Sequence, residues 1–165
     1  MSANFLFFKN YYNDVFIETG SGVGEGIWSA IHSGFKEIFS IELSPKLYNY
    51  CKEKYKDFSN VHMIFGDSRD KLQELISTID IPITFWLDAH ISGGDTVGDD
   101  LPPLFEEIEI IGKHHIKNHT ILIDDLRCWN WNNELMSAIL KINNNYQFTI
   151  EDGLFPQDIL TARVI

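Results

Sequence analysis

The chain alternates short apolar runs with longer segments in which apolar positions recur at helical spacing. The runs have the length and the β-branched or aromatic content of buried strands, and we expect strands over residues 14–18, 38–42, 61–65, 83–87 and 120–123. The other segments predict helices over residues 24–33 and 45–57, one beginning at Asp67 or Ser68, one carrying Leu104, Ile108 and Ile111, and one over residues 131–142. This alternation is typical of βαβ units.

Single residues mark several of the predicted helix ends. Gly34 is a natural stop for the first helix, because glycine tolerates the left-handed conformation that ends many helices. Ser44 and Pro45 provide an N-cap and a first-turn proline for the second helix. These two boundaries therefore depend on local chemistry as well as on periodicity.

The last part of the chain departs from this rhythm. Residues 146–150 and 159–165 have the pattern of two strands joined by a turn through Gly153 and Pro156. Two strands with so short a connection must pair antiparallel. We therefore predict one α/β domain over residues 1–165, a three-layer Rossmann-like sandwich whose mostly parallel seven-stranded sheet ends in an antiparallel β-hairpin.

Each of the five predicted parallel strands leads directly into acidic residues. These acids are Glu18, Glu42, Asp67, Asp88 and the pair Asp124 and Asp125. Because the carboxyl ends of parallel strands meet at one edge of a sheet, the acids should gather where open α/β sheets bind their ligands. The first run also opens into a turn with glycine at positions 20, 22 and 24. The edge is therefore predicted to hold a nucleoside-like cofactor.

Composition limits the class of protein. Hydrophobic residues make up 44% of the 165 residues, as expected of a folded domain with a full core. No apolar run approaches the length of a membrane span, so no membrane partner is expected. Cys51 and Cys128 are too few for a disulfide framework or a cysteine-based zinc site. The composition favours a reduced, cytoplasmic setting.

Acidic residues are distributed unevenly along the chain. Residues 1–60 carry 7 acidic and 6 basic residues, whereas residues 61–165 carry 17 acidic and 7 basic residues. Such a surface repels phosphate backbones, so nucleic acid is not an expected partner. It favours a divalent cation or a cationic substrate. A solvated acidic face that only aids solubility is an equal alternative.

These features resemble the class I S-adenosylmethionine-dependent methyltransferases over nearly the whole chain. The phase of the glycines separates this family from dinucleotide-binding proteins, because a G-x-G-x-x-G motif counted from Gly20 would need a glycine where Glu25 stands. The chain instead reads E-x-G-x-G-x-G from Glu18. An NAD-binding oxidoreductase on the same scaffold is one alternative, and a module that binds S-adenosylmethionine without catalysis is another.

The resemblance implies an S-adenosylmethionine site at the ends of the predicted strands. Glu42 would accept hydrogen bonds from both ribose hydroxyls, Asp67 would contact the adenine amino group, and Glu18 would lie beside the ammonium group. The implied cofactor-binding residues are Glu18, Gly20, Ser21, Gly22, Gly24, Glu42, Leu43, Gly66, Asp67, Ser68 and Asp88. The structural alternative is that Glu18 and Glu42 only terminate strands and that Asp67 only caps a helix.

A second implication concerns a metal. Asp88, Asp124 and Asp125 resemble the magnesium ligands of metal-dependent O-methyltransferases, including catechol-type and sugar-modifying enzymes. Carboxylate oxygens suit Mg²⁺, which would bind an acceptor hydroxyl and lower its pKa. In the structural alternative, Asp124 binds backbone amides of a loop and Asp125 lies in solvent.

Two residues of the loop after the fourth predicted strand are the implied catalytic pair, His90 as general base and Asp88. An acid usually occupies the position of His90 in the sugar O-methyltransferases, and a histidine that only braces the loop is the alternative. Asp95 is either a further ligand or only a turn residue, with the turn favoured. The glycines of this loop are consistent with a mobile lid.

Other residues are read as structural or as substrate-facing. His114, His115 and His119 read as helix-end and loop residues, where positive charge near a helix C-terminus is favourable. Trp129 and Trp131 could wall a flat substrate, although loop packing explains them equally.

The predicted acceptor is a small molecule or a glycan. Residues 1–13 form only a short lead-in, without the separate lid domain or N-terminal helices that cover the substrate in many relatives. The site is therefore expected to be open to a bulky acceptor, or to be covered by the second subunit of a homodimer.

Overall fold

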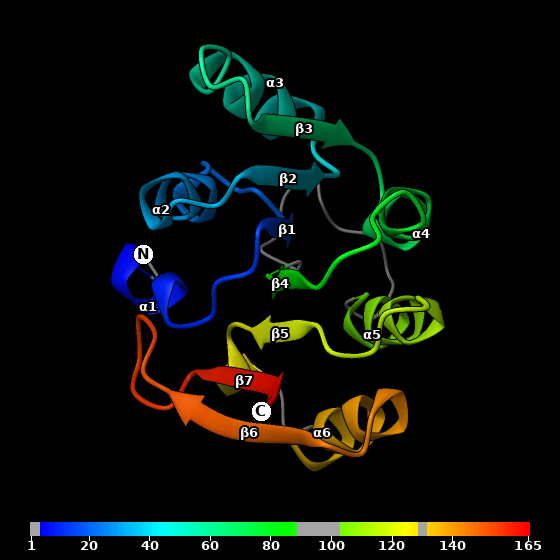
Figure 1. The fold of residues 1–165 in the computed structure, drawn as a ribbon. Helices are drawn as coiled ribbons and strands as arrows, with labels where there is room; N and C mark the ends of the chain where they lie inside the picture. The colour runs from blue at the N-terminus through cyan, green and yellow to red at the C-terminus, as the bar shows by residue number, and fades with distance from the viewer. Residues whose placement is uncertain (1–3, 89–102, 129–131) are drawn as a thin grey trace.

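Seven strands form one twisted sheet with helices on both faces (Figure 1). The computed structural model of the chain describes residues 4–88, 103–128 and 132–165. The strands are β1 (Val15–Thr19), β2 (Glu37–Glu42), β3 (Val61–Phe65), β4 (Ile83–Leu87), β5 (Thr120–Ile123), β6 (Tyr146–Glu151) and β7 (Ile159–Val164). They lie in the order β3-β2-β1-β4-β5-β7-β6, with β1 to β5 parallel and β7 antiparallel to both of its neighbours. The predicted fold class is confirmed.

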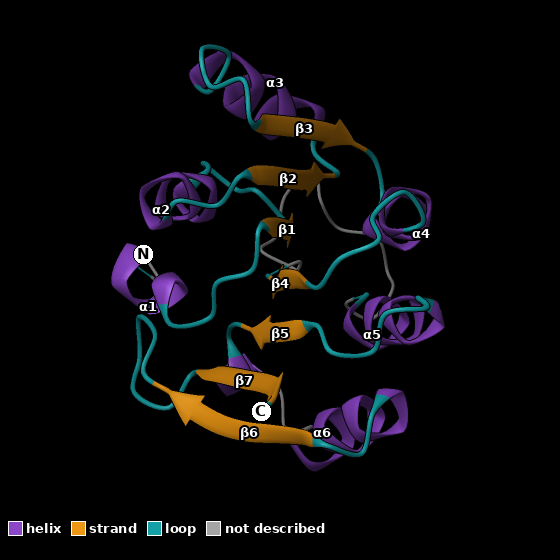
Figure 2. Ribbon diagram, viewed as in Figure 1, coloured by secondary structure: helices purple, strands orange, loops and turns teal. Residues whose placement is uncertain are grey.

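The helices divide into two layers (Figure 2). They are α1 (Phe5–Lys9), α2 (Glu25–Ser33), α3 (Pro45–Lys54), α4 (Ser68–Ile76), α5 (Leu104–Lys113) and α6 (Asn132–Ile142), with a short 3₁₀ helix over Leu126–Cys128. The first three helices bury residues in one apolar core and the last three in a second core on the opposite face of the sheet. In the described parts of the chain, no helix combines the length and the apolar character that crossing a membrane requires.

Helix α1 lies in the segment that the sequence predicted only as a short lead-in. The Asn4 side chain caps it by accepting hydrogen bonds from the backbone amides of Leu6 and Phe7, at 2.9 and 3.1 Å. Phe8 is fully buried, and its ring lies 5.1 Å from the ring centroids of both Phe16 and Trp86. The lead-in therefore covers one face of the sheet over β1 and β4.

Strand β1 is the centre of the part of the sheet that positions the predicted site. All five of its residues are buried, and it pairs in parallel with β2 on one side and with β4 on the other. The pairing sets Glu18 opposite Ser40 and Thr19 opposite Leu87. The ends of β1, β2 and β4 therefore lie side by side at one edge.

The opposite edge of the sheet contains a buried pair of histidines. The backbone amide of Ile83 donates to Nδ1 of His119 at 3.1 Å, and Nε2 of His119 lies 2.9 Å from Nδ1 of His114. Because Nδ1 of His119 accepts a hydrogen bond, the proton of the neutral ring is on Nε2, from which it is donated to His114. The arrangement requires both rings to be neutral.

His114 ends α5 and His119 lies in the following loop, as predicted, but both rings are neutral, so a favourable positive charge near the helix C-terminus does not account for them. Burial lowers the pKa of His119 to about 4 and also lowers the pKa of His114, and the nearby His115 and Lys117 act in the same direction on both. His115, by contrast, is exposed, with its Nε2 3.2 Å from a carboxylate oxygen of Asp80.

We expect the neutral histidine pair to contribute a decrease in the free energy of unfolding as the pH falls from 8 to 5. The unfolded chain protonates these histidines near pH 6.5, whereas the folded protein resists protonation, so stability present above pH 6.5 is lost below it. His119 alone should account for roughly 2 kcal/mol of this loss. Urea unfolding at several pH values measures it. His119→Asn keeps an acceptor near Ile83 and should flatten the dependence; an unchanged pH profile would contradict the assignment.

Candidate functional site

The glycine-rich loop between β1 and α2 adopts a conformation that favours glycine. Gly20, Gly22 and Gly24 have φ values of 82°, 50° and 82°, in the left-handed region. The amide of Gly20 donates to the carbonyl of Ile41 at 2.9 Å, and the amide of Gly24 donates to the carbonyl of Ser21 at 2.7 Å. The loop is thus anchored to β2 at its start and closed by a turn at its end.

The glycines have different neighbours. A Cβ added to Gly22 would meet no atom within 4 Å, so one side of the loop is open there. A Cβ added to Gly24 would lie 2.6 Å from Cε2 of Tyr55, at the end of α3. The resemblance implied that Gly20, Gly22 and Gly24 all bind the cofactor. Gly22 faces open space, whereas Gly24 is needed for packing against Tyr55.

Glu18 is buried where β1, β2 and α2 meet. The hydroxyl of Ser40 donates to its Oε2 at 2.5 Å, and the hydroxyls of Ser21 and Ser40 are 2.7 Å apart. A Cβ added to Gly26 would lie only 1.8 Å from Oε1, so α2 needs glycine at this position. Glu18 is therefore linked through Ser40 to the glycine-rich loop.

The pKa of Glu18 lies well above its ordinary value. Burial is the main cause, and the charges of Asp88 and Glu42 raise the pKa further. The hydrogen bond from Ser40 opposes part of this rise. The carboxylates of Glu42 and Asp88 thus lie close enough to Glu18 to affect its pKa. Of the acids that the sequence predicted to converge at one edge of the sheet, these three lie near one another there.

Glu42 binds the backbone on two sides. Its Oε2 accepts from the amide of Gly22 at 3.1 Å, and its Oε1 accepts from the amide of Ser44 at 2.8 Å. Each carboxylate oxygen has two lone pairs, so each can accept one further hydrogen bond. Leu43 beside it is 47% exposed, so an apolar side chain lies on the surface next to Glu42.

Asp67 follows β3 and begins α4. Its Oδ1 accepts from the backbone amide of Arg69 at 2.9 Å, and its Oδ2 accepts from Nη2 of Arg69 at 2.7 Å. The hydrogen bonds from Arg69 lower the pKa of Asp67. Asp67 therefore caps α4, as the structural alternative proposed, and Gly66 before it has a φ of 142°. Ser68 is buried in the first turn of the helix.

Glu107 of α5 is a buried acid that the sequence prediction missed. Burial raises its pKa to about 7, and the hydroxyls of Ser68 and Thr19 beside it counteract part of that rise. A signal was present in the sequence, because Glu107 falls at helical spacing from Leu104 and Ile111 on the buried face. Helix α5 thus places a carboxyl group beside the end of β1 and the first turn of α4.

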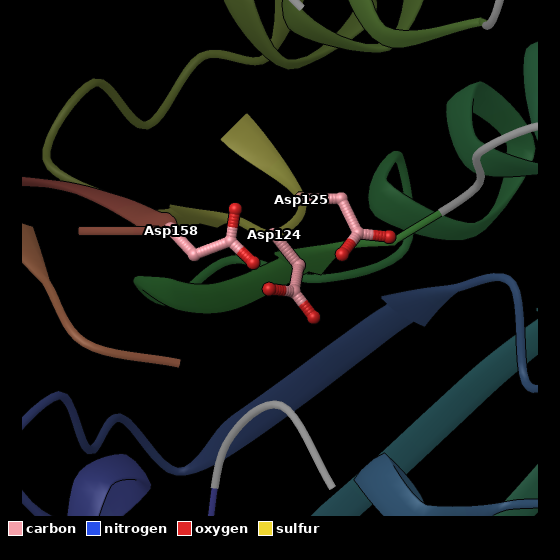
Figure 3. Close-up of side chains that lie close together, drawn as sticks. All are labelled: Asp124, Asp125 and Asp158. Atoms are coloured by element: carbon pink, nitrogen blue, oxygen red, sulfur yellow. The ribbon is translucent and has the colours of Figure 1, made fainter. Parts of the chain in front are cut away.

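A separate acidic cluster forms where β5 meets β7. Asp124, Asp125 and Asp158 are buried, and one carboxylate oxygen of each lies within 4.8 Å of the others (Figure 3). Asp125 has a φ of 60°, and its burial rules out the alternative in which it lies in solvent. Asp88 does not belong to this cluster. Its role as a metal ligand remains a prediction.

Arg127 supplies positive charge to this cluster. Its Nη1 lies 2.5 Å from Oδ1 of Asp125 and also contacts Oδ2 of Asp158. Its backbone amide donates to Oδ1 of Asp158 at 3.0 Å. The guanidinium also lies 4.2 Å from the centroid of the Phe155 ring. Arg127 therefore ties the end of β5 to the turn before β7.

Several predicted residues lie outside the described ranges. They are His90, Asp95, Trp129 and Trp131, together with the proposed lid. Asp88 is described, and its amide extends the pairing of β4 by donating to the carbonyl of Thr19 at 3.1 Å.

Comparison with known proteins identifies the fold. No protein-family model matches the chain, and a search of curated proteins found no match. Among solved structures, an S-adenosylhomocysteine-bound methyltransferase from Podospora anserina has a TM-score of 0.64 and 16% identity, over 98% of this chain and 76% of that one. A precorrin-6y C5,15-methyltransferase from Geobacter metallireducens has a TM-score of 0.59 and 16% identity, over 90% and 80% of the two chains.

A third similar structure is a candidate rRNA methylase from Clostridium thermocellum, with a TM-score of 0.61 and 15% identity over the full length of both chains. At such identities the likeness is one of fold. The chain has the fold of the S-adenosylmethionine-dependent methyltransferases, and the resemblance inferred from its sequence is confirmed at this level.

We expect Glu18→Gln to stabilise the protein at pH 8 and to have a smaller effect at pH 5. The unfolded chain ionises Glu18 near pH 4.5, whereas the folded protein resists ionisation, so stability is lost as the pH rises toward the raised folded-state pKa. Removing the carboxylate should increase Tm at pH 8 by about 2–6 °C. Calorimetry at both pH values measures this. Exposed Glu74→Gln is the control, and an equal gain at both pH values would contradict the assignment.

Proposed function

We propose that this chain is an S-adenosylmethionine-dependent methyltransferase. The observation that carries the proposal is the loop between β1 and α2, whose open side at Gly22 lies beside Glu42 and near the buried carboxyl of Glu18. The fold, which a methyltransferase bound to S-adenosylhomocysteine shares, supports this reading of the loop.

The residues at this edge suit the proposed cofactor. Glu42 keeps acceptor capacity on both oxygens and would bind the two ribose hydroxyls. Glu18 would lie near the ammonium group, and the surrounding acids favour a ligand with positive charge. Asp67 would contact the adenine amino group from the start of α4, beside the apolar side chain of Leu43. When bound, S-adenosylmethionine supplies an electrophilic methyl group on a sulfonium.

The two rival functions use the same edge differently. An NAD-binding oxidoreductase would need space for a pyrophosphate at the start of α2, where Glu25 supplies an acidic side chain that repels phosphate. A binding module without catalysis would keep the cofactor residues and lack a function for the second acidic cluster. The methyltransferase proposal accounts for both groups of acids.

We propose further that the reaction is O-methylation assisted by Mg²⁺. The donor set of the acidic cluster fits a hard divalent cation, because Asp124, Asp125 and Asp158 bring carboxylate oxygens within 4.8 Å of one another. A cation held there would bind an acceptor hydroxyl and lower its pKa. Arg127 neutralises Asp125 and Asp158, and it would have to release one of these carboxylates for the cation to bind it. Asp88, from the neighbouring strand end, remains the proposed further ligand.

His90 remains the proposed general base, with a small molecule or a glycan as the acceptor. The acid excess of residues 61–165 supports an acceptor without a phosphate backbone.

The cofactor proposal predicts measurable binding of S-adenosylhomocysteine. Glu42→Gln should weaken it roughly tenfold or more, because an amide replaces a carboxylate that accepts two hydrogen bonds from the ribose. Glu37→Gln, at the exposed start of β2, is the matched control and should bind as the wild type does. Calorimetric titration measures all three proteins. Binding of NAD in place of S-adenosylhomocysteine would overturn the proposal in favour of the oxidoreductase.

The metal proposal predicts that Mn²⁺ or Mg²⁺ binds and that Asp124→Asn abolishes the binding, while S-adenosylhomocysteine still binds to the variant. Removing one of three carboxylates lowers both the charge and the number of ligands. Arg127→Met removes the competing cation and should strengthen metal binding. Calorimetric titration with metal alone measures each variant. Metal affinity unchanged by Asp124→Asn would reject the cluster as the metal site. Loss of metal binding in Asp88→Asn alone would instead indicate a site at the end of β4.

A further inference from the structure

We propose that α3 acts as a positioning element for the cofactor by fixing three consecutive carbonyl groups of the glycine-rich loop; this inference rests on the proposed function. Sγ of Cys51 contacts the carbonyl of Gly22 at 3.5 Å. Nζ of Lys54 donates to the carbonyl of Val23 at 2.8 Å, and the hydroxyl of Tyr55 donates to the carbonyl of Gly24 at 2.5 Å. We call these three side chains the carbonyl clamp.

The spacing of the carbonyl clamp suits a helix. Residues three and four positions apart lie on the same side of a helix, so Cys51, Lys54 and Tyr55 all reach the loop from α3 and its C-terminal end. The order of the donors matches the order of the carbonyls, residue by residue. Such a match requires the loop to run along the side of α3 in one register.

The clamp determines where the loop amides point. A trans peptide is planar, with its N–H directed opposite to its carbonyl. Holding the carbonyls of Gly22, Val23 and Gly24 toward α3 therefore turns the following amides away from α3. Glu42, at the end of β2, accepts from the amide of Gly22. The loop is thus held in a single conformation by contacts from both α3 and β2.

Fixing this loop matters because its glycines have more conformational freedom than other residues. An unrestrained loop with glycine at positions 20, 22 and 24 would lose that freedom on binding a ligand, which weakens the affinity. Tyr55 is the strongest part of the clamp. Its hydroxyl is buried, its pKa is raised mainly by burial, and its ring fills the space where Gly24 lacks a side chain.

The test compares Tyr55→Phe with Tyr50→Phe. Phenylalanine keeps the ring against Gly24 and removes only the hydroxyl, and Tyr50 is an exposed tyrosine of the same helix. Tyr55→Phe should weaken the binding of S-adenosylhomocysteine roughly three- to tenfold, as expected for one hydrogen bond. Hydrogen exchange of the amides at residues 22–25 should accelerate, while exchange in β1 and β4 stays as in the wild type. Tyr50→Phe should change neither quantity.

The outcomes separate the clamp from the proposed function. A wild-type protein that does not bind S-adenosylhomocysteine rejects the proposed function. Tyr55→Phe with wild-type affinity and wild-type exchange at residues 22–25 rejects the clamp. If Tyr55→Phe does not fold, Lys54→Met takes its place, with exposed Lys52→Met as its control. Lys54→Met should lower the affinity for S-adenosylhomocysteine, and Lys54→Arg should restore it. Equal affinities in the wild type, Lys54→Met and Lys54→Arg would reject the clamp.

Discussion

The structure depends on the position of β1 between two parallel neighbours. Every residue of β1 is buried, so the carboxyl group of Glu18 is carried into the interior together with the strand. A buried acid is unfavourable unless its surroundings accommodate it. Here Ser40 donates a hydrogen bond to Glu18, and Gly26 has no side chain that would collide with the Glu18 carboxyl group. The glycine-rich loop, the start of α2 and the end of β2 are all arranged around this one group.

The two groups of acids are accommodated by different means. At the ends of β1 and β2, the hydroxyl of Ser40 and backbone amides hold Glu18 and Glu42. At the junction of β5 and β7, Arg127 places its guanidinium against the carboxylates of Asp125 and Asp158. The first arrangement relies on neutral hydrogen-bond donors, whereas the second contains its own counter-ion.

Most of the fold was predictable from the sequence because local signals agreed with tertiary packing. The strand ends at Glu42, Phe65, Leu87 and Ile123 were predicted correctly. Each apolar run in the sequence ends at the residue where the strand reaches the carboxyl edge of the sheet. Residues that depend on non-local contacts were not predicted correctly. Asp158 joins Asp124 only because β7 returns beside β5 in the opposite direction. The His114–His119 pair is neutral through burial that spacing along the chain does not reveal.

The topology of the hairpin has a consequence for biosynthesis. Strand β7 follows β6 in the chain yet lies between β5 and β6 in the sheet. Until β7 has left the ribosome, the backbone of β5 presents an unpaired border to other nascent chains, and Asp158 has not yet reached Asp124 and Asp125. The pairing of β7 with β5 and the assembly of this acidic cluster therefore occur together, after β6 has been synthesised.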